Sequence, residues 1–267
     1  MTALTIFIDT VGLCGPGLEN WAAAQPVLRG DAPYVTSATA ITPSNFLPAA
    51  ERRRVGVAVK LALATATDAL QHSHHLASEL LSVFSSSGGD GDNCHVICEA
   101  LASDDRLISP TRFTNSVHNA PSGYWGIALQ AKPASTSLCA FDGSFSAGFL
   151  EACTQAKTAH APVLLIAYDT PYPEPLRATR PIVHSLGIAL VVSPVRTAST
   201  LAKVSVGLGQ RAASAMHHPE LEALRCNVPA ARGLPLLQAI ASGQMAASLV
   251  LDLFENQQLL LDVSTTP

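Results

Sequence analysis

Apolar residues follow two different periods along the 267-residue chain. Short runs rich in β-branched and aromatic residues are typical of strands. Such runs occupy residues 5–9, 82–85, 136–141, 162–168, 187–193, 204–208 and 259–263. Apolar residues three or four positions apart predict helices over residues 18–28, 49–70, 94–101, 123–131 and 144–156. Because the predicted strands and helices follow one another in turn, the sequence predicts an α/β fold.

The composition is typical of a globular chain with a large core. Hydrophobic residues make up 48% of the sequence and charged residues 13%, which leaves room for a large, partly apolar interface. The net charge of −4 argues against nucleic acid as a partner, because phosphate binding depends on Lys and Arg. No apolar run approaches the roughly 20 residues that cross a bilayer, and residues 1–10 lack a secretion signal. We therefore expect a cytoplasmic protein without membrane insertion, with its cysteines as reduced thiols.

Two groups of potential metal ligands occur in the sequence. His72, His74 and His75 offer three imidazoles, but their spacing fits no familiar zinc site. Cys94 and Cys98 lie four residues apart, without the second ligand pair that a structural zinc site requires, so we expect them to be buried thiols. The sequence predicts no metal and no cofactor.

Two arrangements could support catalysis by this chain alone. Ser146 lies in a segment close to the nucleophile motif of α/β-hydrolases, and Asp169 and His184 follow in the order that this class uses. Against this hypothesis, the first glycine of the motif is missing and Ser146 falls inside a predicted helix. A Cys139 nucleophile with His118 as its base would instead make an acyltransferase.

A longer pattern covers residues 109–152, which read SPTRFTNSVHNAPSGYWGIALQAKPASTSLCAFDGSFSAGFLEA. This segment resembles the active-site region of β-ketoacyl synthases. In that family an asparagine and a glycine precede an apolar helix, a lysine turn and a strand follow, and a nucleophilic cysteine precedes the next helix. Aligned without gaps, Asn119, Gly123 and Lys132 match this pattern, and Asp142 stands at the position of the cysteine. Residues 7–30 resemble the start of ketosynthase chains, and residues 51–70 resemble their first long helix.

The resemblance implies a thiolase-like layered fold, with α/β/α/β/α layers. It also implies one domain over residues 1–267, with an N-terminal half at 1–157 and a shortened C-terminal half at 158–267. Most of the resemblance lies in the N-terminal half.

The departures from the family pattern concern its chemistry. A condensing cysteine works as a thiolate at a helix N-terminus, where the helix dipole lowers its pKa. Asp142 removes that nucleophile, and we expect its carboxylate to cap the helix that follows. The H-G-T-G-T loop and the later Gly-His of the family, which supply two histidines, are both absent from the sequence. The resemblance therefore implies a chain that does not condense acyl groups by itself.

This combination resembles the chain length factors of type II polyketide and aryl-polyene systems, including the N-S-V-H-N-A motif at residues 115–120. The resemblance implies a heterodimer with an active ketosynthase, which receives acyl chains from an acyl carrier protein. An acyl-binding homodimer is the alternative assembly. The resemblance assigns the partner interface to one strand: Thr136, Ser137, Leu138, Cys139 and Ala140. It assigns the lining of the acyl tunnel to six residues: Arg112, Phe113, Val117, His118, Phe141 and Phe145. Bulky side chains there would act as a steric ruler.

Overall fold

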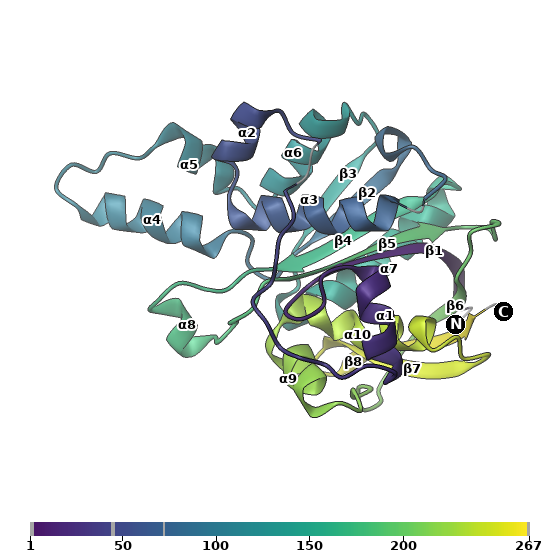
Figure 1. Cartoon of the computed structure of the whole chain (residues 1–267). Helices are drawn as coiled ribbons and strands as arrows, with labels where there is room; N and C mark the ends of the chain where they lie inside the picture. The colour runs from purple at the N-terminus through teal and green to yellow at the C-terminus, as the bar shows by residue number, and fades with distance from the viewer. Residues whose placement is uncertain (1–2, 44–45, 72, 266–267) are drawn as a thin grey trace.

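The computed structural model describes residues 3–43, 46–71 and 73–265 (Figure 1). In these residues the strands form one eight-stranded sheet in the order β3-β2-β4-β5-β1-β6-β8-β7. The pairs β3-β2 and β2-β4 are parallel, and every other pair is antiparallel. The strand bounds are β1 Leu4–Cys14, β2 Leu81–Ser85, β3 Ser135–Leu138, β4 Val163–Asp169, β5 Leu186–Ser193, β6 Ala202–Gly209, β7 Ala247–Phe254 and β8 Gln257–Thr265.

Helices cover both faces of this sheet (Figure 1). Two hydrophobic clusters lie on opposite faces of the sheet. Alternate residues of β4 belong to different clusters, because successive side chains of a strand point to opposite faces. Val163 and Leu165 belong to the cluster under α1, α7 and α10, whereas Leu164 and Ile166 belong to the cluster under α3 and α6. The helix bounds are α1 Trp21–Arg29, α2 Ala49–Arg54, α3 Val57–Leu70, α4 Gly91–Ala102, α5 Pro110–Asn115, α6 Ala120–Leu129, α7 Ser144–Ala159, α8 Leu176–Thr179, α9 Pro219–Asn227 and α10 Leu234–Ala241. Three short 3-10 helices complete the described elements: η1 Ala77–Glu79, η2 Phe141–Gly143 and η3 Pro229–Gly233.

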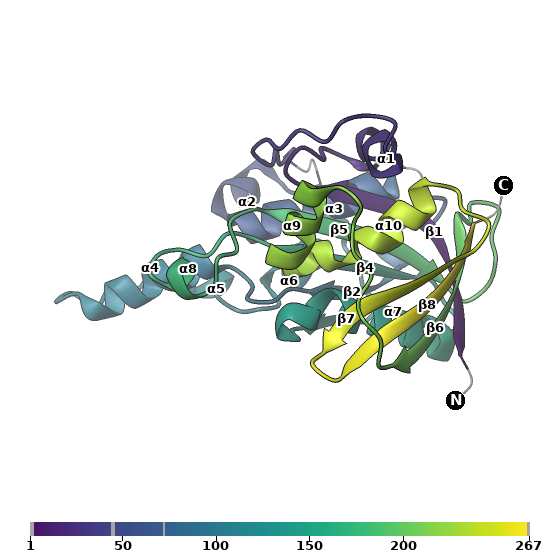
Figure 2. The same ribbon diagram turned by 90° about the horizontal axis from the view of Figure 1, so that it is seen from below.

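The predicted α/β class is confirmed. The α/β/α/β/α layers expected from the resemblance contain two sheets, whereas the described strands hydrogen-bond into one continuous sheet. β1 pairs with β5 on one side and with β6 on the other, so the hydrogen bonding is continuous across both halves of the chain. The sheet is twisted, so that β6, β8 and β7 run at an angle to the other strands (Figure 2). Since strands from residues 1–157 and 158–267 are interleaved, we propose that the chain is a single domain.

Several predicted elements have different bounds in the structure. The helix expected over residues 49–70 is two helices, because Val55 and Gly56 take extended conformations and α3 begins at Val57. Gly56 fits closely against the Asp90 carboxylate, where a Cβ atom would lie 2.0 Å from Oδ2. The strand expected at residues 136–141 ends at Leu138, and the one expected at 5–9 continues to Cys14. Strand β7 and helices α9 and α10 were not predicted. Among the described helices, none is long and apolar enough to cross a membrane.

Candidate functional site

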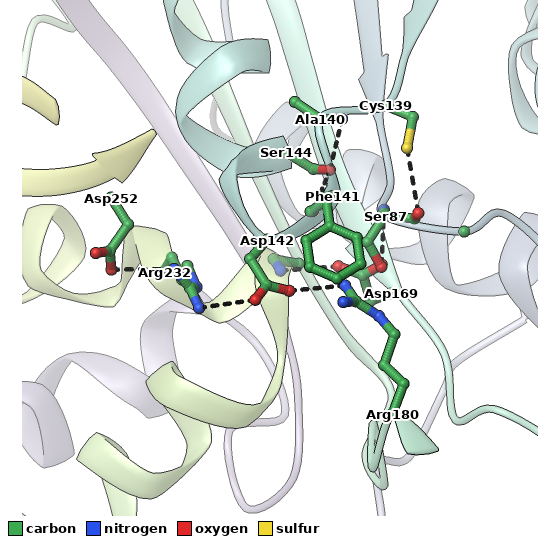
Figure 3. A network of polar contacts seen from close by, with 12 residues as sticks. Ser87, Cys139, Ala140, Phe141, Asp142, Ser144, Asp169, Arg180, Arg232 and Asp252 are labelled. Atoms are coloured by element: carbon green, nitrogen blue, oxygen red, sulfur yellow. Dashed lines mark hydrogen bonds and ion pairs between the residues drawn. The ribbon is translucent and has the colours of Figure 1, made fainter. Parts of the chain in front are cut away.

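A tight turn connects the edge strand β3 to helix α7. Its residues Cys139 and Ala140 lead into η2, and α7 begins at Ser144. The Ser144 hydroxyl accepts a hydrogen bond from the Ala140 amide at 3.0 Å and donates one to the Phe141 carbonyl at 2.7 Å. Ser144 therefore closes the turn that presents Phe141 and Asp142 (Figure 3).

Asp142 does not cap α7, so that expectation was wrong. The N-cap position is Gly143, and no side chain caps the first turn. The Asp142 carboxylate points instead toward two arginines from the C-terminal half (Figure 3). Arg180 Nη2 donates to Oδ1 at 2.7 Å, and Arg232 Nη2 lies 3.3 Å from Oδ2. Two guanidinium groups attract the carboxylate more strongly than neutral helix amides do.

The ion pairs continue beyond Asp142 along the C-terminal half. Arg232 Nη1 lies 3.3 Å from Asp252 Oδ2, and Arg225 Nη1 lies 2.9 Å from the same oxygen. Arg225 also donates two hydrogen bonds to Glu222, at 2.7 and 2.8 Å. These bonds lower the pKa of Glu222 to about 2. We call this row of alternating charges, formed by Asp142, Arg232, Asp252, Arg225 and Glu222, the ion ladder. It links η2 to η3, β7 and α9.

A buried carboxylate, Asp169, lies close to this turn at the end of β4. It accepts hydrogen bonds from the Ser87 amide at 2.9 Å, the Ser87 hydroxyl at 2.6 Å and the Ala230 amide at 2.8 Å. Burial raises the pKa of Asp169 to about 6, although these hydrogen bonds oppose the rise. Asp169 thus joins the ends of β2 and β4 to η3.

The raised pKa of Asp169 predicts a pH-dependent stability. The folded chain holds this proton more tightly than the unfolded chain, in which the carboxyl has its ordinary pKa of 3.8. The corresponding stabilisation is present below pH 3.8 and is lost as the pH rises through 6. We expect the free energy of unfolding of the unmodified chain to fall by about 2 to 3 kcal/mol relative to Asp169→Asn between about pH 4 and pH 7.

Urea unfolding of both chains across this pH range measures the difference. Glu222 titrates in both chains and cancels in the comparison. A difference that stays constant with pH would contradict the prediction.

The interface residues expected on one strand lie on β3 and just beyond it. β3 is the last strand of the sheet on its side, with β2 as its neighbour. Thr136 Oγ1 accepts a hydrogen bond from Gln155, whereas the buried Ser137 Oγ has no partner in the described part of the chain. Leu138 ends the strand. Cys139 is exposed, and its thiol lies 3.2 Å from the Ser87 carbonyl oxygen, while Ala140 is half-buried.

The residues expected to line a tunnel divide into exposed and buried ones. Arg112, Phe113 and Val117 are exposed on α5 and the turn after it, and Phe141 is 63% exposed. His118 is half-buried, with Nε2 3.1 Å from the Ser86 carbonyl oxygen.

The expectation for Phe145 does not fit its position. Its ring is fully buried in the core against Phe149, 2.4 Å from where a Cβ atom on Gly233 would stand. It therefore lines no surface of this chain.

The structure does not assemble the serine hydrolase site. Ser146 is fully buried within α7, and its hydroxyl has no hydrogen-bond partner among the described residues. Asp169 bonds the Ser87 and Ala230 groups described above. His118 and Cys139 do flank one loop, because they contact the neighbouring carbonyls of Ser86 and Ser87.

The potential metal ligands form no cluster within the described ranges. Three or more His, Cys, Asp or Glu side chains are nowhere arranged there to hold an ion. His72 lies outside the described residues. Cys94 and Cys98 are exposed rather than buried, because α4 projects away from the sheet (Figure 2).

Comparison with known proteins defines the class of this α/β protein. The family model described as the N-terminal domain of β-ketoacyl synthase matches residues 20–253. The chain therefore belongs to the β-ketoacyl synthase family, as its sequence predicts. A search of curated proteins finds no match.

Solved structures share its fold. A ketosynthase (ApeO) in complex with its chain length factor (ApeC) from Xenorhabdus doucetiae contains a chain with 21% identity and a TM-score of 0.73, over 98% of this chain and 99% of that one. The ishigamide ketosynthase/chain length factor gives 13% identity and a TM-score of 0.72, over 98% and 100%. A type II polyketide acyl-carrier protein complex with its ketosynthase (AntDE:AntF) gives 11% and 0.77, over 99% and 100%. These likenesses establish the thiolase-like ketosynthase fold.

Sequence reasoning missed the two arginines that bind Asp142. Arg180 is 38 residues from Asp142 in the sequence, and Arg232 lies in the half where the family resemblance is weak. Neither belongs to a local motif. The sequence pattern does not separate them from other arginines, because their role depends on tertiary contact.

Proposed function

We propose that this chain is the non-catalytic subunit of a ketosynthase heterodimer, a chain length factor that shapes the acyl tunnel and sets product length. The pathway class is polyketide, aryl-polyene or related fatty-acid-like biosynthesis in the cytoplasm. The observation that carries the proposal is Asp142. At the position of the family's nucleophile it presents a carboxylate held in ion pairs with Arg180 and Arg232, and a carboxylate so held is a poor nucleophile toward a thioester.

The edge strand β3 supports pairing with a partner. The amides of Ser82 and Ser86, on and just after β2, donate to the carbonyls of Ala134 and Leu138. By alternation, the amide and carbonyl of Ser137 point away from β2, toward the open edge. Such an edge is a template for a strand of another chain. The resemblance implies that the equivalent strand of a ketosynthase takes this place.

Uncovered apolar side chains support a large contact beyond β3. Helices α4 and α5 form an arm that projects from the sheet (Figure 2). Within α4 only Asn93 is buried, so the helix gains little stability from its own chain. Leu107, just before α5, is 78% exposed, and Phe113, on α5, is 64% exposed. A ketosynthase covering the arm would bury these side chains and bring Phe113 to the growing chain delivered by an acyl carrier protein.

The ruler itself can be tested at Phe113. In the complex of this chain with its co-purified ketosynthase, Phe113→Ala should lengthen the products by about one or two two-carbon units, because it opens space at the tunnel wall. Mass spectrometry of the products measures the shift. Met245→Ala is the control, since Met245 is 81% exposed in the turn before β7. Unchanged products from Phe113→Ala would remove Phe113 from the wall.

A further inference from the structure

Phe141 adopts an unusual conformation at the end of the proposed interface. It lies three residues after β3, and its φ angle is +51°. A left-handed backbone costs about 1 kcal/mol or more for a residue with a side chain, so neighbouring contacts must hold it. Ser144 and the hydrogen bond from the Gly143 amide to the Ala140 carbonyl hold the backbone. Phe141 as a residue is 63% exposed despite its apolar side chain.

Arg180 holds the ring of Phe141 from one side. Its guanidinium carbon lies 3.7 Å from the centroid of the Phe141 ring (Figure 3). The same carbon lies 5.9 Å from the centroid of the Tyr172 ring. The Arg180 side chain is 17% exposed, and Nη2 is fixed to Asp142 at 2.7 Å. The loop that carries Arg180 is closed by a hydrogen bond from the Tyr172 amide to the Ile182 carbonyl at 3.1 Å. One side chain therefore grips both residues of the turn.

We propose that Arg180 is a positioning residue that holds the Phe141 ring as a fixed wall of the partner's acyl tunnel, and so helps to determine product length. This inference rests on the proposed function. A free exposed phenylalanine samples several rotamers, whereas a ring stacked on a guanidinium presents its other face in one orientation. Asp142 contributes by anchoring Arg180 in the stacking position. The residue that replaces the nucleophile thus supports the wall.

We call the contacts of Arg180 with Phe141 and Asp142 the clamp, and they are tested first in the isolated chain. Cys139 is exposed two residues before Phe141, and its alkylation by iodoacetamide reports whether the turn is held. Arg180→Gln removes the ion pair and weakens the stack, so we expect Cys139 to react about fivefold faster, since a cation–π contact contributes on the order of 1 kcal/mol. Peptide mass spectrometry separates Cys139 from Cys98, an exposed thiol on α4 whose rate should not change. An unchanged Cys139 rate would overturn the clamp.

The wall is tested in the complex with the co-purified ketosynthase. Arg180→Lys keeps a cation for Asp142 but loses the flat guanidinium that stacks on Phe141. We expect it to lengthen the products in the same direction as Phe141→Ala, while the amount of complex stays the same. Products unchanged by Arg180→Lys, alongside a shift caused by Phe141→Ala, would refute the positioning role. If no ketosynthase complex forms at all, the proposed function fails and the wall with it, whereas the Cys139 result still decides the clamp.

Discussion

Ser137→Pro will abolish association with the ketosynthase while the chain itself stays folded. The Ser137 amide faces the open edge of β3, as the bonds from Ser82 to Ala134 and from Ser86 to Leu138 require. Proline therefore removes one outward donor and no bond to β2. In a strand-to-strand interface, that loss and the bulk of the ring should weaken binding by about a hundredfold or more.

Pull-down of the ketosynthase with the tagged chain, followed by titration of the purified subunits, measures this effect. Ser137→Ala keeps the amide and should retain the complex. Thr136→Pro is the opposite case, because the Thr136 amide faces β2, and it should lower the melting temperature of the chain itself. A complex of normal affinity with Ser137→Pro would show that β3 is not the pairing edge.

Gly143→Ala should destabilise the chain by about 3 kcal/mol or more, because the added methyl group has no room. A Cβ atom on Gly143 would lie 1.8 Å from the carbonyl oxygen of Leu253. This oxygen belongs to the backbone of β7, so the clash can be relieved only by moving the strand or the turn. The turn after Asp142 and the end of β7 would have to separate, which would also strain the ion ladder.

Chemical denaturation of the isolated chain measures this change. Gly123→Ala is the matched control, since a Cβ atom at Gly123 in α6 meets nothing within 4 Å. Because alanine favours a helix interior, this control should be neutral or stabilising by about 0.5 to 1 kcal/mol. Equal stability of both variants would mean that η2 and β7 do not approach as closely as described.

The sequence predicts those parts of the fold whose signals are local. The buried run at 162–168 and the periodic helix at 144–156 are confirmed as β4 and α7, because period and length suffice to separate them. The break between α2 and α3 was missed, since apolar spacing continues through Val55 and Gly56. At the break Gly56 fits against Asp90, which is far away in the sequence and therefore gives no local signal.

The candidate site shows the same division. The family alignment placed Asp142 at the position of the nucleophile, because the residues around the turn form one continuous segment of the sequence. A single-helix view of that segment suggested a cap, whereas the true partners Arg180 and Arg232 come from other elements. The resemblance assigned Phe145 to the tunnel lining, yet the first turn of α7 faces the core. Burial of this kind is decided by packing between elements rather than by the local pattern.

The structure changes the meaning of Asp142. From the sequence it marks a lost nucleophile with a capping role. In the fold it is the first acid of the ion ladder, and it joins the turn after β3 to η3 and to the loop that carries Arg180. The position that the family resemblance gives to the nucleophile therefore carries these ion pairs, as expected if the proposed non-catalytic role is correct.

A condensation assay with acyl- and malonyl-loaded acyl carrier protein tests the non-catalytic role most directly. The three samples are the isolated chain, the complex with its co-purified ketosynthase, and the complex in which the ketosynthase nucleophile is replaced by alanine. We expect products only from the second sample, with Ser137→Pro abolishing their formation in parallel with the complex. Condensation by the isolated chain, or by the complex with the inactivated ketosynthase, would contradict a non-catalytic role.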